Sequence, residues 1–173
     1  MPIKNPTKLR KWSSVIIALL IACAGIVMIY ITNSITITSK AELTEIQGEL
    51  LWIKPEITKG CSSYDMRLGI YSNEFKIAAD YDGLFGFQRL LDDNSGKLDL
   101  KLLIRKTDVP KLNSKEHVKV YGLKSIGKPY LDVEDVLTSD ADSRSQAPYI
   151  AGLMFLLAIG IYVFRRYFYK SDF

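Results

Sequence analysis

The chain has 173 residues, of which 48% are hydrophobic and 24% are charged, with a formal net charge of +4. These averages fit one globular domain, but no Asp, Glu, Lys, Arg or His lies in the 28 residues between Lys11 and Lys40, or in the 20 residues from Ser145 to Phe164. Two uncharged stretches, one near each end, largely exclude a simple soluble enzyme and predict a membrane protein.

The first uncharged stretch predicts a transmembrane helix over residues 13–33. Val15 to Ile31 is an unbroken apolar run, and with Trp12 and Thr32 at its ends it reaches the roughly 20 residues that a helix needs to cross a bilayer. Lipid offers the backbone no hydrogen-bond partners, so a spanning segment of this kind has to be helical.

The same stretch also has features of two other kinds of N-terminal segment. The basic residues of the tail 1–12, followed by an apolar run, also describe a secretory signal peptide. The segment Leu20-Ile21-Ala22-Cys23 resembles the lipobox of bacterial lipoproteins, whose cysteine is lipidated and becomes the new N-terminus. The apolar run continues for eight residues beyond Cys23, however. We therefore expect an uncleaved anchor, with lipoprotein processing as the alternative.

The second uncharged stretch predicts another transmembrane helix over residues 148–164, with Pro148 in its first turn. Basic residues dominate both the tail 1–12 and the tail 165–173, so both tails are expected in the cytoplasm. With both spans in a bacterial inner membrane, the central domain between them is then expected in the periplasm. The expected interface anchors are Trp12, Tyr30, Tyr149, Arg165 and Arg166.

Small residues indicate how the two spans pack against each other. Small side chains let helix backbones approach closely in lipid, and the expected contact residues are Ala18, Ala22, Gly25, Ala151 and Ala158. Apart from Cys23 and tyrosines, neither span carries an ionisable side chain. This argues against a proton relay or a transport site in the membrane.

The segment between the spans, residues 34–137, is expected to form a β-rich domain, and residues 138–147 a polar, flexible tether. Asn33 to Ala147 carries 16 basic and 18 acidic residues, a net charge of −2, which argues against nucleic-acid binding. Strands are expected at Leu43–Ile53 with a bend at Gly48, Tyr64–Tyr71, Glu74–Ala79, Leu98–Ile104, His117–Leu123 and Tyr130–Leu137. Lys54-Pro55 is expected to end the first strand.

A short helix is expected between the third and fourth strands, over Leu84 to Leu91, with Asp82 as its cap. The expected core is formed by Leu43, Ile46, Met66, Leu68, Ile70, Phe75, Ile77, Leu100, Leu102, Val118, Val120, Leu131 and Val133. Because this core is large, a fragment from Lys40 to Leu137 is expected to be soluble, monomeric and β-rich.

This order of elements resembles the OB-fold, a small five-stranded barrel with a helix between its third and fourth strands. The resemblance rests on element order and on Gly48, over roughly Ala41 to Leu137, and one strand after the helix is in excess. It implies an α+β fold in which a two-helix transmembrane hairpin carries an OB-like barrel. OB-folds host many functions, so the resemblance assigns none.

No arrangement of residues in the sequence predicts catalysis or a cofactor. His117 is the only histidine, and although Ser114 and Asp108 precede it, no nucleophile motif accompanies them. We expect an ordinary surface histidine. One histidine and one exported cysteine cannot supply the usual zinc ligands, and Asp80-Tyr81-Asp82-Gly83 lacks the calcium-loop spacing. No cofactor and no metal are expected.

Two further features of the exported domain are candidates for contact with other molecules. Asp132, Glu134 and Asp135 form an acidic cluster that could meet a basic partner, although a solvated strand face is the simpler interpretation. Cys61 is a lone exported thiol in the loop Gly60-Cys61-Ser62-Ser63. It is open to an intermolecular disulfide, although a free thiol is the simpler expectation.

The function predicted from these features is that of an interaction module. A two-span inner-membrane protein would present its β domain to another membrane or periplasmic protein, in an accessory or immunity-type role. The bilayer and that protein are the expected partners. The alternative is an envelope enzyme or ligand-binding protein that uses a cleft of the β domain.

Overall fold

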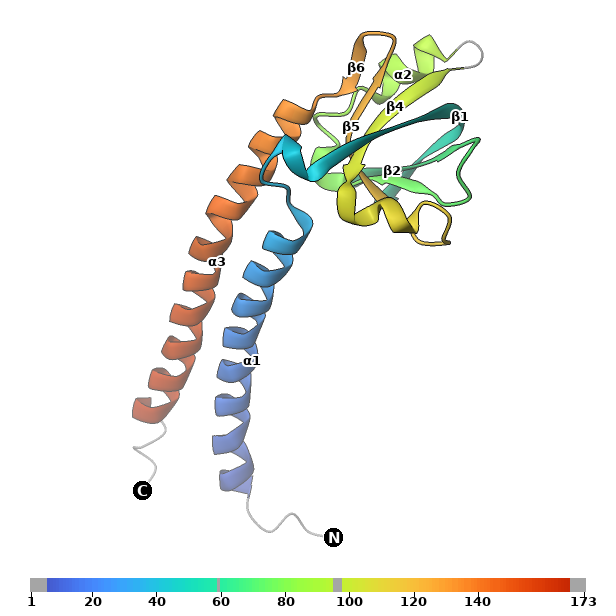
Figure 1. The fold of residues 1–173 in the computed structure, drawn as a ribbon. Coiled ribbons are helices and arrows are strands. Elements are labelled where there is room, and N and C mark those ends of the chain that lie inside the picture. The colour runs from blue at the N-terminus through green and yellow to red at the C-terminus, as the bar shows by residue number, and fades with distance from the viewer. Residues whose placement is uncertain (1–5, 59, 95–97, 169–173) are drawn as a thin grey trace. The chain divides into compact units, whose positions relative to one another are not determined.

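The computed structural model of the chain describes residues 6–58, 60–94 and 98–168 and has an α+β architecture (Figure 1). In chain order the elements are α1 (Pro6–Ile35), η1 (Lys40–Glu42), β1 (Leu43–Thr58), β2 (Cys61–Leu68), β3 (Phe75–Ile77), η2 (Ala79–Tyr81), α2 (Phe87–Asp93), β4 (Asp99–Arg105), η3 (Lys106–Lys111), β5 (Val118–Ser125), β6 (Lys128–Leu131) and α3 (Val133–Phe168). The α+β class and the short helix between the third and fourth strands are therefore confirmed.

The chain forms two packed units. The helical unit contains Met1–Thr36 and Asp142–Phe173, and the β unit contains Ile37–Ala141. The first turns of α3 thus belong to the β unit. Each unit has its own packing and is described separately below.

The strands of the β unit form one six-stranded sheet in the order β3-β2-β1-β4-β5-β6. Neighbours in this order run antiparallel. In addition, β3 pairs with β5 in parallel, with Phe75 opposite Val118 and Lys76 opposite Lys119. Hydrogen bonding therefore connects β1, β2, β3, β5 and β4 in turn, and β4 pairs again with β1.

The long strand β1 changes partners near its middle. Residues Leu43–Glu49 pair with β4, whereas Leu50–Thr58 pair with β2. Gly48 lies just before this change, and a Cβ there would stand 3.2 Å from the Leu68 Cβ, so a larger residue would require the Leu68 side chain to shift. Contrary to expectation, Pro55 does not end the strand. Proline lacks an N–H donor, and here β1 pairs with β2 alone.

A continuous apolar core fills the β unit. Its fully buried side chains include Ile37, Met66, Leu68, Phe75, Ile77, Leu90, Leu100, Leu102, Ile104, Val118, Val120 and Val136. Most of the predicted core residues lie in this cluster or pack against it. Ile70 does not, because β2 ends at Leu68 and the chain turns there, with the Tyr71 N–H bonded to the Leu68 carbonyl. The Ile70 side chain is 67% exposed.

The predicted helix cap Asp82 has a different role in the structure. It follows η2, and α2 begins only after Gly86. The Asp82 carboxylate instead accepts hydrogen bonds from the Tyr64 hydroxyl at 2.6 Å and from the Ser62 N–H at 3.2 Å. These contacts attach the segment after β3 to β2. The bonded residues are 18 and 20 positions apart in the sequence, so local sequence patterns do not indicate that they are in contact.

The region after β6 is helical where the sequence predicted a strand to Leu137 and then a flexible tether. β6 ends at Leu131 and α3 begins at Val133. The Asp132 carboxylate accepts the Glu134 N–H at 3.0 Å, which caps the helix. The segment that follows contains no glycine, and Pro148 lies inside α3 rather than in its first turn. The polar residues 138–147 are therefore helical.

The helical unit contains α1 and the remainder of α3, which lie side by side (Figure 1). Val15–Ile35 and Val133–Phe164 are long and apolar enough to cross a membrane. Gly25 packs against Ala151, and a Cβ on Gly25 would stand 3.5 Å from the Ala151 carbonyl oxygen. Large apolar side chains on both helices are exposed, among them Leu19, Leu20, Ile26, Leu153, Leu156 and Leu157.

Candidate functional site

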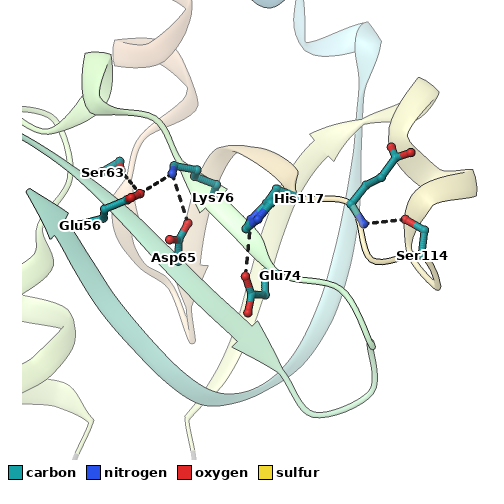
Figure 2. A network of polar contacts seen from close by, with 8 residues as sticks. Glu56, Ser63, Asp65, Glu74, Lys76, Ser114 and His117 are labelled. Atoms are coloured by element: carbon teal, nitrogen blue, oxygen red, sulfur yellow. Dashed lines mark hydrogen bonds and ion pairs between the residues drawn. The ribbon is translucent and has the colours of Figure 1, made fainter. Parts of the chain in front are cut away.

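A polar network covers one outer face of the β unit (Figure 2). Side chains alternate between the faces of a strand, so Glu56 on β1, Ser63 and Asp65 on β2 and Lys76 on β3 share this face. The Lys76 ammonium donates to Glu56 at 2.6 Å and lies 3.7 Å from Asp65. This hydrogen bond holds the pKa of Glu56 below its usual value and raises the pKa of Lys76.

His117 lies beside this network but does not join a catalytic triad (Figure 2). Its Nδ1 is 3.6 Å from the Glu74 carboxylate, and its side chain is about half exposed. The Ser114 hydroxyl accepts the Glu116 N–H at 3.0 Å, while Asp108 pairs with Lys111 at 2.9 Å. The three residues that a triad would require thus have three separate partners.

A second polar cluster is buried, and Asp140 of α3 is at its centre. Asp140 is only 3% exposed. One carboxylate oxygen accepts the Tyr81 hydroxyl at 2.8 Å, and the other accepts the Ile37 N–H at 2.6 Å. The residue that begins the β unit and the α3 turn that ends it are therefore bonded to each other, and η2 is bonded to the same α3 turn through Tyr81.

Lys119 and Arg105 complete this buried cluster through aromatic contacts. The Lys119 ammonium lies 4.6 Å from the ring centre of Tyr81 and 5.0 Å from that of Tyr121. The Arg105 guanidinium lies 5.4 Å from the Tyr121 ring centre. Burial lowers the pKa of Lys119, against the opposing effect of the nearby Asp140 carboxylate. Both cations are half-buried, and such cation–aromatic contacts strengthen as the cation is removed from water.

Tyrosine–aspartate hydrogen bonds recur around the segment from Ala79 to Asp93. Besides the Tyr64–Asp82 and Tyr81–Asp140 pairs, the Tyr130 hydroxyl donates to Asp93 at 2.8 Å. Burial is the main cause that raises the pKa of each of these tyrosines, and it raises the pKa of Tyr130 to about 12. The three bonds fix η2 and α2 to β2, β6 and α3.

The raised pKa values predict a loss of stability in alkali. The pKa of unfolded tyrosine is about 10, so the protonated Tyr130 contributes stability that is fully present below pH 10 and is lost as the pH rises toward 12. Tyr64, Tyr81 and Tyr121 act in the same direction. In the full chain in detergent, the tyrosinate absorbance contributed by these four residues should therefore appear together with the loss of β-sheet circular dichroism. Complete ionisation near pH 10 with an intact β signal would contradict this prediction.

The acidic cluster of Asp132, Glu134 and Asp135 lies at the start of α3. Asp132 caps α3, and Glu134 and Asp135 lie in its first turn, where negative charge interacts favourably with the helix dipole. Glu134 also pairs with Lys40. The cluster is therefore a helix start rather than a strand face.

The other predicted site residues lie on the helices and on β2. Gly25, Ala151 and Ala158 are buried, whereas Ala18 and Ala22 are half-buried. Tyr30 and Tyr149 are exposed, and so are Cys23 and, at the start of β2, Cys61. Trp12, Arg165 and Arg166 lie within α1 and α3, but their side chains are outside the described part of the chain. Among the described residues, no group of three or more His, Cys, Asp or Glu could hold a metal ion.

Asp140 was not predicted as a functional or structural residue, although the sequence contains a signal for it. Val133, Val136, Leu137 and Asp140 fall at i, i+3, i+4 and i+7, the spacing of one helix face. The three apolar residues belong to the core or pack against it, and Asp140 extends the same face. The polar composition of the following residues obscured this pattern.

No protein-family model matches this chain, and no curated protein or solved structure matches it either.

Proposed function

We propose that the chain is a two-span protein of a bacterial inner membrane, with both termini in the cytoplasm and the β unit in the periplasm. The two apolar segments and the exposure of their large side chains support this, because such surfaces are stable in lipid. The Gly25–Ala151 contact supports a hairpin, since small residues allow close helix packing in membranes. The basic tails favour the proposed orientation.

We further propose that the β unit is an OB-type barrel with β6 as an added strand. The support is the circuit of pairings from β1 through β2, β3, β5 and β4 back to β1, with β3 and β5 parallel. The short helix α2 between β3 and β4 agrees with it.

The function that we propose for this unit is to bind another membrane or periplasmic protein, in an accessory role. The observation that carries the proposal is the exposure of large apolar side chains on the β unit. Leu51 is 55% exposed, Ile70 67%, Ile57 73% and Ile126 94%. A bulge between Leu50 and Trp52 accounts for one of these exposed side chains, since Leu51 is the extra residue there. A partner protein that covered these side chains would remove them from water.

Reporter fusions test the orientation. Alkaline phosphatase fused after Ala141 should be active, because the enzyme matures only outside the cytoplasm, and the same reporter fused after Phe173 should be inactive. A fusion after Lys11 provides the cytoplasmic control. Activity at Phe173 with inactivity at Ala141 would show that the topology is the reverse of the one proposed. Activity at both sites would show that the second apolar segment does not cross the membrane.

Purification of the tagged full chain in mild detergent tests the interaction. We expect one protein to co-purify in a fixed ratio and to remain bound through size exclusion. A retained small molecule in place of a protein would favour the ligand-binding alternative. Recovery of the chain alone, from cells that produce it at its natural level, would contradict the proposed function.

A further inference from the structure

The loop of residues 69–74, which connects β2 to β3, has an inverted distribution of polar and apolar side chains. Asn73 is fully buried, whereas Ile70 is 67% exposed. Neither the Oδ1 nor the Nδ2 of Asn73 has a hydrogen-bond partner in the described part of the chain. In one short loop, a polar side chain is therefore inside the β unit and an apolar side chain is outside it.

Both placements make this conformation of the loop costly. A buried amide without partners has lost the hydrogen bonds that water would give it, and such unpaired groups are rare in native structures. An isoleucine in water forgoes the free energy that burial of its side chain would release. The two costs are relieved together if Asn73 turns out to water and Ile70 turns in.

The end of the loop is fixed, whereas its middle is held weakly. The Glu74 carbonyl accepts the Val118 N–H at 2.9 Å, which attaches the loop to β5. The turn after β2 is closed by a bond from the Tyr71 N–H to the Leu68 carbonyl, and its length of 3.3 Å is greater than usual. A rearrangement confined to residues 70–73 breaks this long bond and leaves the pairing of β2 with β3 intact.

Ile70 lies at the margin of the core, so the movement that would bury it is short. A Cβ on Gly48 would stand 3.3 Å from the Ile70 Cγ1 and 3.2 Å from the Leu68 Cβ. Leu68 is fully buried. The exposed isoleucine and a core leucine thus lie over the same point of β1.

We propose that the loop of residues 69–74 is a two-state element of the β unit. In the conformation described above, Asn73 is inside and Ile70 is outside. In the second conformation, Asn73 is in water and Ile70 packs against the core. This exchange goes beyond the proposed function and does not depend on it. It would nevertheless affect partner binding, because the second conformation removes Ile70 from the exposed apolar side chains on which that function rests.

Relaxation-dispersion NMR measures the exchange in the full chain in detergent, with isoleucine methyl groups labelled. The Ile70 signal should show exchange on the microsecond-to-millisecond timescale with a minor population of roughly 0.1–10%. Ile77 is the internal reference, because it is fully buried on β3 and should show no such exchange. A single state at Ile70 would overturn the proposal.

Substitutions at Asn73 test whether the unpaired amide causes the exchange. Asn73→Leu removes the amide and keeps most of the volume, and Asn73→Ala removes both. At least one of them should raise the thermal midpoint of the β unit by roughly 5 °C, and both should suppress the exchange at Ile70. A lower midpoint for both variants would overturn the proposal, because it would show that the amide is hydrogen-bonded in the folded protein, for example through an internal water molecule.

A substitution at Ile70 tests whether the two side chains move together. Ile70→Ser removes the gain from burial in the second conformation, so the minor population, observed at the Tyr71 N–H, should fall at least about tenfold. Ser72→Ala is the matched control, since Ser72 is exposed on the same loop and its replacement should change nothing. An unchanged population in I70S would overturn the coupling. None of these results depends on a partner, so co-purification tests the proposed function separately.

Discussion

A fragment from Thr36 to Asp142 is expected to fold as a stable, β-rich monomer, whereas the shorter fragment from Lys40 to Leu137 should be largely unfolded at room temperature. The sequence predicted a domain over residues 34–137 and predicted that the shorter fragment would fold by itself. In the structure the β unit extends from Ile37 to Ala141, and the shorter fragment removes both Ile37, which is fully buried, and Asp140.

The size of the effect follows from these two losses. Removing a fully buried isoleucine side chain costs about 2–5 kcal/mol. Losing Asp140 leaves the buried Tyr81 hydroxyl without its acceptor, at a further cost of about 1–3 kcal/mol. Their sum is comparable with the whole stability of a small domain, about 5–15 kcal/mol.

Urea unfolding followed by circular dichroism measures the difference between the two fragments. An intermediate fragment from Thr36 to Leu137 separates the contribution of Ile37 from that of the last α3 turn. If the Lys40–Leu137 fragment unfolds at the same urea concentration as the longer one, Ile37 and Asp140 are not part of the cooperative core.

Asp140→Ala should destabilise the β unit by about 3 kcal/mol in the full-length protein. The carboxylate accepts two hydrogen bonds, from the Tyr81 hydroxyl and the Ile37 N–H, and both donors are buried. Their loss leaves two buried donors unpaired, which costs more than the hydrogen bonds themselves contribute. The substitution also removes the carboxylate that partly opposes the lowering of the Lys119 pKa by burial.

Asp142→Ala is the matched control for this substitution. Asp142 lies on the same helix two residues later and is exposed, so its replacement should change stability by less than about 0.5 kcal/mol. A double-mutant cycle of Asp140→Asn with Tyr81→Phe should give a coupling energy of about 1 kcal/mol. Equal effects of the Asp140 and Asp142 substitutions, or a coupling energy of zero, would show that the buried carboxylate does not hold these elements together.

The sequence alone was sufficient for features that depend on neighbouring residues. The two uncharged stretches determine the long apolar helices, because an apolar segment long enough to cross a membrane is recognised from its own composition. The alternation in Leu98–Ile104 predicted β4 within one residue at each end, since one face of that strand is buried in the core. The short helix between β3 and β4 was predicted from its own spacing in the same way.

Other features were decided by residues that lie far apart in the sequence. The Asp140 carboxylate bonds to Ile37 across 103 residues and to Tyr81 across 59, and the parallel pairing of β3 with β5 joins Phe75 to Val118. Composition and periodicity indicate which side chains can be buried. They do not indicate which distant donor bonds to which acceptor, because the pairing of donors and acceptors depends on how the sheet packs. The sequence therefore determined the two apolar helices and the β-rich class, and only the tertiary structure decided that Asp140 belongs to the core and that Ile70 does not.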